Sequence, residues 1–229
     1  MAETEQRVMN SYDKLFEGIA AILFDLDGTL VDSNEAHARA WVEVFSEYGH
    51  EMELPTVKSL IGLGGDKLLR EAIGEVDEEQ ADAMEKRRSE VFLQKYLRDV
   101  VPVDKANELI VLLKDRGLRV LLATAASQKD REALLARGDL DGQFHGGADA
   151  DQVEESKPAP DTLLACLEGT ELEPRQCLLI GDTPYDGQAA HEAGMRFLAV
   201  ETGGWTADRL TNAAMVVPSV TAMYKALSR

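Results

Sequence analysis

Four short apolar runs, each followed by a small or acidic residue, constrain the fold of this chain more than any other feature of its sequence. Short apolar runs without polar alternation are typical of parallel strands that are covered on both faces. Helical stretches that end at glycine lie close to the later runs. The runs cover residues 19–24, 120–123, 177–180 and 197–200, and the helical stretches cover residues 105–116, 161–168 and 187–193.

The alternation of strand and helix predicts an α/β protein with a doubly wound, Rossmann-like parallel sheet, and residues 215–217 are expected to add a fifth strand. The interval between the first two runs is far too long for one crossover helix. Its composition favours helix over residues 34–48, 67–73 and 78–98. We therefore predict an inserted α-helical cap domain over residues 33–103, a core formed by residues 19–32 and 104–229, and an N-terminal tail over residues 1–18.

The charge balance of the chain excludes some classes of partner. Forty-two acidic residues stand against 24 basic residues, which gives a formal net charge of -18. This field repels nucleic acid and anionic membrane surfaces, so we expect neither as a partner. A small anionic substrate would meet the same repulsion, and its site would therefore need local cations or a metal ion.

Cysteine usage and hydropathy indicate a compartment. Cys166 and Cys177 are expected to be buried thiols rather than a disulfide or a pair of metal ligands. The first 18 residues contain no apolar segment of the kind found in secretory leaders, and the apolar run that follows is too short to span a membrane. We therefore expect a cytoplasmic protein.

The segment that carries most chemical information places Asp25 and Asp27 directly after the first apolar run, followed by Gly28. At this spacing both carboxylates lie on one side as the chain leaves the sheet. They cannot both ionise at low cost unless a cation lies between them or one stays protonated. The pair therefore suggests a metal site, a nucleophile with a partner acid, or both. Taken alone, Asp27 and Gly28 also fit an ordinary turn.

Further polar residues lie at or after the ends of predicted strands, where open α/β sheets bind their ligands. Thr124 ends the second run, Asp182 and Asp186 follow the third, and Lys157 lies in a proline-rich segment before a helix start. A hydroxyl and an ammonium suit a phosphoryl group, and carboxylates offer the hard oxygen ligands that Mg²⁺ prefers. Each feature alone is more often a helix cap or a solvated side chain, but their joint occurrence favours a site.

These segments together resemble the haloacid dehalogenase superfamily, and within it the phosphatase branch with a helical cap inserted after the first motif. The resemblance extends from about residue 19 to the C-terminus in order, spacing and residue type. Asp25 and Asp27 match the D-x-D-G-T motif, Thr124 the second motif, Lys157 the K-P-x-P motif, and Asp182 with Asp186 the G-D-x-x-x-D motif.

The resemblance implies a phosphatase that acts on a small phosphorylated metabolite. Asp25 would attack phosphorus and form an aspartyl-phosphate, while Asp27 would protonate the leaving oxygen and later activate water. Thr124 and Lys157 would stabilise the charge on the transferring group.

The resemblance also implies Mg²⁺ as cofactor. Its ligands would be the carboxylate of Asp25, the backbone carbonyl of Asp27 and the carboxylate of Asp182, with Asp186 acting through water or through a neighbour. Bound there, the metal would neutralise phosphoryl oxygens and let a carboxylate approach another anion.

Substrate contacts are expected from the cap and from the second motif. His37 opens the cap, and the segment with Gly64, Gly65 and Lys67 resembles the specificity loop of the family. Ala125 stands where the family often has Ser or Asn, so that phosphate contact is either missing or made by a backbone amide. The substrate stays open between phosphoglycolate, a sugar phosphate and a nucleotide, and the assembly is expected to be a monomer or a homodimer.

Two other functions stay open. A sugar phosphomutase similar to β-phosphoglucomutase shares the cap and His37, but the mutase holds its distal phosphate with an Arg at the position where this chain has Gly65. A non-catalytic binding or regulatory module is disfavoured, because loss of catalysis usually relaxes costly paired acids and all are present here. Asp27 also argues against a dehalogenase, which usually lacks an acid at that position.

Overall fold

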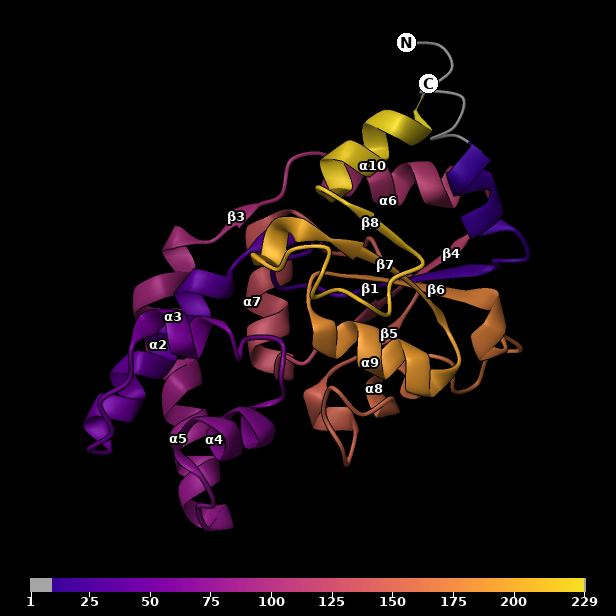
Figure 1. The fold of residues 1–229 in the computed structure, drawn as a ribbon. Helices are drawn as coiled ribbons and strands as arrows, with labels where there is room; N and C mark the ends of the chain where they lie inside the picture. Colours follow the sequence, from indigo (N-terminus) through magenta and orange to yellow (C-terminus); the bar gives the residue numbers. More distant parts are fainter. Residues whose placement is uncertain (1–9, 229) are drawn as a thin grey trace.

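The computed structural model describes residues 10–228, and a six-stranded parallel sheet forms its centre (Figure 1). The strands stand in the order β5-β4-β1-β6-β7-β8, and every neighbouring pair is parallel. The predicted doubly wound α/β architecture is confirmed. The strand bounds are β1 Ala21–Phe24, β4 Arg119–Ala123, β5 Gly147–Ala148, β6 Cys177–Gly181, β7 Arg196–Val200 and β8 Met215–Val217.

Strand β1 occupies the middle of the sheet and is buried along its whole length. From β1 the chain passes to β4 and β5 on one side, then returns to β6, β7 and β8 on the other side. The strand order therefore reverses next to β1. In such a sheet, the groups that follow the carboxyl ends of β1, β4 and β6 are brought together, and a ligand binds where the order reverses.

Helices cover both faces of the sheet, as Figure 1 shows. Alternate residues of β1 point to opposite faces: Ile22 and Phe24 join one buried cluster, and Ala21 and Leu23 join the other. The first cluster includes residues of α6, α7 and α10, and the second includes residues of α8 and α9. The helix bounds are α6 Ala106–Asp115, α7 Gln128–Gly138, α8 Asp161–Ala165, α9 Pro184–Ala193 and α10 Val220–Leu227.

Between β1 and β4 the chain leaves the sheet and forms a segment that we call the helical insert, residues 34–99. Two strands that the sequence did not predict, β2 (Val31–Asp32) and β3 (Val101–Pro102), pair in antiparallel fashion, so the chain enters and leaves the insert at one place. The helices of the insert are α2 Asn34–Glu47, α3 Leu54–Lys58, α4 Gly65–Ile73 and α5 Glu78–Val91, followed by a π-helical turn Phe92–Tyr96 and a 3₁₀ turn Leu97–Asp99.

The N-terminal segment differs from the tail predicted over residues 1–18. Residues 10–16 are helical, and Tyr12 and Leu15 are buried within the main core cluster. Arg196, at the start of β7, donates a hydrogen bond to the carbonyl of Leu15 at 2.6 Å. The sequence gives little signal for this short helix, because its few apolar positions are sparse among charged residues. Residues 1–9 of the predicted tail lie outside the described residues.

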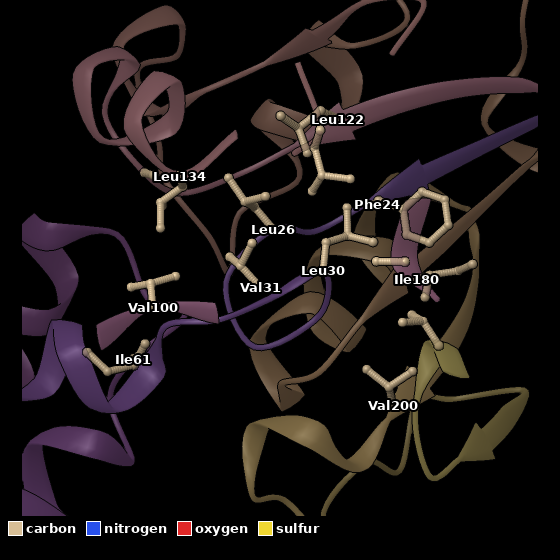
Figure 2. Packing of buried hydrophobic residues seen from close by; sticks show 14 of the residues in the cluster. Phe24, Leu26, Leu30, Val31, Ile61, Val100, Leu122, Leu134, Ile180 and Val200 are labelled. Carbon is tan, nitrogen blue, oxygen red and sulfur yellow. The ribbon is translucent and has the colours of Figure 1, made fainter. Parts of the chain in front are cut away.

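The main core cluster continues from the sheet to the base of the helical insert (Figure 2). Phe24 and Ile180 belong to the sheet, Leu26 and Leu30 to the loop after β1, and Ile61 to the insert. All five side chains are buried in one cluster. The loop that carries the acidic motif is therefore anchored by apolar side chains on both sides of its turn, which limits its freedom to move.

Both cysteines are buried free thiols, as predicted, and burial raises the pKa of Cys166 to about 12 and that of Cys177 to about 11. Among the helices of the described residues, none combines the length and the apolar character that a membrane crossing requires.

Candidate active site

The loop after β1 places two carboxylates in one cleft. Asp25 follows the strand directly, and its backbone N–H donates to the carbonyl of Ile180 on β6 at 2.9 Å, which extends the sheet by one residue. The chain then turns at Gly28, whose φ of 73° is costly for other residues. A Cβ atom at Gly28 would also lie 2.1 Å from an oxygen of Asp182. Asp25 and Asp27 both line the cleft between the core and the insert.

Lys157 lies against the nucleophile predicted from the sequence. Its side chain is 1% exposed, and its ammonium donates to Asp25 Oδ1 at 2.5 Å, to Asp186 Oδ1 at 2.8 Å and to the carbonyl of Ala123 at 3.0 Å. All three ammonium hydrogens therefore have acceptors. Because the two carboxylates outweigh the effect of burial, the pKa of Lys157 lies above its ordinary value and the group stays charged.

Three buried acids converge beside this lysine. Asp25, Asp182 and Asp186 each offer an oxygen, and these oxygens lie within 4.8 Å of one another. Burial, together with the charges of Asp186 and Asp27, raises the pKa of Asp25 to about 7 against the opposing effect of Lys157. Burial and the neighbouring acids also raise the pKa of Asp182 well above its ordinary value. The cluster therefore has more negative charge than one ammonium can balance.

The donor set of this cluster fits a hard divalent cation. Asp182 accepts from Asn34 Nδ2 at 2.9 Å and from Thr29 Oγ1 at 3.2 Å, both neutral donors, so no ammonium or guanidinium of the described residues pairs with it. Both oxygens of Asp186 are engaged, one by Lys157 and the other by the backbone and hydroxyl of Thr183. Carboxylate oxygens with unbalanced charge are the ligands that Mg²⁺ takes. Asp25 and Asp182 are therefore better placed for direct contact than Asp186.

Asp27 has a different environment from Asp25. Its Oδ1 lies 2.5 Å from Ser33 Oγ and 2.9 Å from His37 Nε2, and the His37 ring stacks on Phe92 with centroids 4.0 Å apart. Although burial acts in the opposite direction, the charge and hydrogen bond of His37 lower the pKa of Asp27. Two carboxylates of one loop thus have pKa values displaced in opposite directions. Without a metal this favours the protonated form of Asp25 and the ionised form of Asp27, whereas a cation bound at Asp25 would favour the ionised form of that carboxyl.

The loop after β4 contributes Thr124 and Ala125. Thr124 is fully buried, and its Oγ1 accepts from the backbone N–H of Ala126 at 3.1 Å, while none of the described residues accepts a hydrogen bond from its hydroxyl. The amide of Ala125 has no hydrogen-bond partner among the described residues, and Ala125 lines the cleft. This loop therefore offers a hydroxyl and an amide as donors to an anion.

The residues predicted in the insert divide into two groups. His37 and Gly65 line the cleft. Gly64 and Lys67 instead contact the core segment before Lys157: the amide of Gly64 donates to the Lys157 carbonyl at 3.3 Å, and Lys67 Nζ donates to the Ser156 carbonyl at 2.6 Å. These two residues hold the loop against the core.

Sequence reasoning missed Arg88 and Asp130. Arg88 of α5 lines the cleft, lies 5.6 Å from the ring centroid of Trp41 and forms an ion pair with Asp130 of α7, which is fully buried. Ser89 Oγ donates to the same carboxylate at 2.6 Å. In a helix as rich in charge as α5, one inward arginine has only a weak local signature. Arg88 lies four residues after Met84 and three before Val91, the buried residues of this helix, and this spacing is the signal that could have located it.

Comparison with known proteins matches residues 22–200 to the haloacid dehalogenase-like hydrolases. The chain is 33% identical over 187 residues to fructose-1-phosphate phosphatase YqaB of Escherichia coli (strain K12), an alignment that covers 79% of this chain and 96% of the relative. It is 30% identical over 191 residues to a phosphoglycolate phosphatase of Nitrosospira multiformis, with 81% of this chain and 84% of the relative covered.

A solved structure agrees in fold. The crystal structure of a hydrolase from Pseudomonas syringae superposes with a TM-score of 0.82 at 24% identity and covers 91% of this chain and 97% of that one. The family match spans the strands that carry Asp25, Thr124 and Asp182. With the acidic cluster, the parallel sheet and these likenesses in agreement, the chain belongs to the haloacid dehalogenase-like hydrolase family.

Proposed function

We propose that this protein is a Mg²⁺-dependent phosphatase that hydrolyses a small phosphomonoester through an aspartyl-phosphate on Asp25. The observation that carries the proposal is the Lys157 ammonium, which lies 2.5 Å from Asp25 inside a cluster of buried acids, while Asp27 is bound by His37 in the same cleft. The relatives named above are phosphatases, and this chain aligns with most of the length of each. This likeness supports the same reaction class.

In the proposed reaction Asp25 attacks phosphorus, and the ester oxygen leaves as an alcohol after it receives a proton from Asp27. Asp27 then takes a proton from water as that water attacks the aspartyl-phosphate, which releases inorganic phosphate and restores both carboxyl groups. His37, 2.9 Å from Asp27, keeps this carboxyl oriented. The Thr124 hydroxyl, the Ala125 amide and the Lys157 ammonium act as donors to the phosphoryl oxygens.

Asp25 and Asp182 are the residues that would hold Mg²⁺, with the Asp27 carbonyl as the backbone ligand and Asp186 fixing Lys157 from the side. A bound Mg²⁺ supplies charge neutralisation for the transferring group. The buried, under-compensated acids favour this assignment over a cluster that functions without a metal.

Gly65 argues against the phosphomutase alternative. A Cβ at this position would lie 2.4 Å from the carboxyl carbon of Glu85, so the place where a mutase carries its phosphate-binding arginine is filled by an acid. A distal phosphate would therefore meet negative charge instead of a cation. We infer hydrolysis rather than transfer between two positions of a sugar phosphate.

The proposal is tested by measuring inorganic phosphate release from a panel of phosphomonoesters, with Mg²⁺ and with a chelator. In Asp25→Asn the nucleophile is lost, and we expect kcat to fall by about 10³-fold or more, because the aspartyl-phosphate route is closed. Mass spectrometry of the trapped wild-type protein should locate the phosphoryl adduct on Asp25.

Asp32→Asn is the matched control, because Asp32 is an exposed carboxylate of β2 that lies outside the acidic cluster. It should retain wild-type turnover. Full activity in Asp25→Asn, or isomerisation of a hexose 1-phosphate to its 6-phosphate without net phosphate release, would contradict the proposal.

A further inference from the structure

The wall of the cleft that the helical insert contributes is lined mainly by apolar side chains. Trp41 of α2, Leu63 of the loop before α4 and Leu68 of α4 line it, and Trp41 and Leu68 are almost fully buried. The reacting phosphoryl group lies at the core, so this wall is what the rest of the substrate would contact. An apolar wall suits the carbon skeleton of the leaving group and offers no charge to it.

The basic side chains that line the cleft already have acidic partners. Among the described residues these side chains are Arg88, bound to the fully buried Asp130, and His37, bound to Asp27. Lys67 does not line the cleft, and its ammonium lies 2.9 Å from Glu155. A second anionic group on the substrate would therefore have to compete with a protein carboxylate for each of these partners.

Glu85 adds negative charge beside the same wall. Its carboxyl group packs against Gly65, which lines the cleft, and none of the described residues forms a hydrogen bond or an ion pair with it. Burial raises the pKa of Glu85 to about 7, and the acids Asp66, Asp82 and Asp151 act in the same direction while Arg88 opposes them. Above about pH 7, where Glu85 is ionised, a leaving group with its own negative charge would face this acid without a free cation to offset it.

A terminal nitrogen of the Arg88 guanidinium still lacks a partner. Asp130 binds Nη1 and the guanidinium lies over Trp41, while Nη2 has no acceptor among the described residues. An N–H donor next to an apolar surface is satisfied by a hydroxyl or ether oxygen, which brings no net charge into the cleft.

From this arrangement, and resting on the proposed phosphatase function, we propose that the leaving group is an uncharged, hydroxyl-bearing carbon skeleton, so that the enzyme selects sugar or polyol monophosphates against esters that carry a second phosphate or a carboxylate. Arg88 donates to a hydroxyl of the leaving group, and Asp130 and Glu85 oppose a second anion. The specificity follows from repulsion as much as from contact.

Two pairs of esters isolate the charge of the leaving group. 2-Hydroxyethyl phosphate differs from phosphoglycolate by an alcohol in place of a carboxylate, and fructose 1-phosphate differs from fructose 1,6-bisphosphate by one phosphate. In both pairs we expect kcat/KM of the wild-type protein to be roughly tenfold or more higher for the ester with the uncharged leaving group, because like-charge juxtaposition is costly. Equal values, or preference for the doubly anionic member, would overturn the proposal.

Variants test whether the named acids cause the preference. Asp130→Asn should free the charge of Arg88, and Glu85→Gln should remove a negative charge, so each should reduce the ratio of kcat/KM within a pair by roughly threefold or more. Glu79→Gln is the matched control, because Glu79 is an exposed acid on the same helix. A variant that is merely less stable lowers kcat/KM equally for both esters of a pair and leaves their ratio unchanged. An unchanged ratio in Asp130→Asn and Glu85→Gln would therefore count against the role assigned to these acids.

The failure of the specificity inference is distinguishable from failure of the proposed function. p-Nitrophenyl phosphate serves as a general ester, because its hydrolysis requires the phosphoryl-transfer residues around Asp25 but not Glu85 or the pair of Arg88 with Asp130. If it is hydrolysed and the paired esters show no preference, only the specificity inference is wrong. If no ester, including this one, yields phosphate in the presence of Mg²⁺, the phosphatase proposal and the inference that rests on it are both overturned.

Discussion

Asp182 is the acid of the cluster that lacks a cationic partner among the described residues. Lys157 uses its three hydrogens on Asp25, Asp186 and a backbone carbonyl, which leaves Asp182 with hydrogen bonds from Thr29 and Asn34 only. Neutral donors stabilise a buried carboxylate less than an ion pair does. In the absence of metal, Asp182 is therefore expected to destabilise the fold whenever it is ionised.

We predict that Asp182→Asn stabilises the metal-free protein in a pH-dependent way. An acid whose pKa is raised in the folded state costs nothing below its unfolded pKa, where it is protonated in both states. Its destabilising effect grows as pH rises from the unfolded pKa to the folded pKa and is complete above the folded pKa. The gain should therefore be near zero at about pH 4 and reach about 1 kcal/mol or more at about pH 8. The Oδ1 atom of Asn34, buried and without a partner among the described residues, can accept from the new amide after rotation of its side chain.

Urea unfolding in a chelator at several pH values measures this difference. Addition of Mg²⁺ should reverse the order of stability, because the wild-type protein gains binding energy that the variant loses. A variant less stable than wild type at all pH values without metal would show that the hydrogen bonds to Asp182 outweigh its charge.

At the scale of elements, the start of α9 positions two functional acids at once. Asp182 directly follows β6, and Thr183 is the N-cap of α9, where its side chain and that of Asp186 exchange hydrogen bonds with backbone amides in a capping box. Pro184 occupies the first turn, which suits its fixed φ. The N-cap hydrogen bonds that begin the helix therefore also orient Asp186 toward Lys157.

Thr183→Ala should destabilise the protein by about 1–2 kcal/mol, the usual cost of removing an N-cap hydroxyl. It should also lower kcat, because Asp186 loses a 2.6 Å hydrogen bond and holds Lys157 less firmly. Urea unfolding and phosphate release measure the two effects. Thr183→Ser keeps the hydroxyl and loses only the methyl that faces Gly62, so it should recover most of both quantities.

The elements that the sequence predicted are those with a local signature. The apolar runs gave β1, β4, β6, β7 and β8 to within two residues at each end, because buried parallel strands carry a continuous apolar pattern. Strand β5 was missed, since Gly147–Ala148 is only two residues long and depends on pairing with β4. Helices α3, α7 and α10 and the pair β2 and β3 were also missed, because short or charge-rich segments are decided by tertiary contacts.

The same distinction applies to the site. Asp25, Asp182 and Asp186 could be predicted because they lie in short motifs at strand ends, and Lys157 because it lies in a proline-rich motif before a helix. The structure brings all four together. The contacts of the insert depend on how two separate segments meet. The pairing of Arg88 with Asp130 joins residues 42 positions apart, and nothing in either local sequence indicates it.

At the scale of the whole molecule, the net charge of -18 acts as a uniform destabilising force. Self-repulsion among excess acids opposes the compact state, and dissolved salt screens it over about 10 Å at roughly 0.1 M ionic strength. We therefore predict that the melting temperature rises when ionic strength is increased from low values to about 0.2 M at about pH 8.

A second rise should follow when Mg²⁺ replaces part of the salt at constant ionic strength, since specific binding adds to screening. This second rise should be absent in Asp182→Asn, whereas the screening effect should persist. Equal responses of both proteins to Mg²⁺ would indicate that the cation acts only by screening.

The antiparallel pair of β2 and β3 fixes where the insert is joined to the core. Val31 pairs with Pro102 and Asp32 with Val101, so the two strands that connect the insert to the sheet lie side by side as one ribbon. At the cleft the insert meets the core through non-covalent contacts between residues far apart in the sequence, among them the ion pair of Arg88 with Asp130 and the hydrogen bond from Lys67 to Ser156. The position of the cleft wall that the insert forms therefore depends on contacts that single substitutions can remove, whereas the ribbon keeps the two ends of the insert in place.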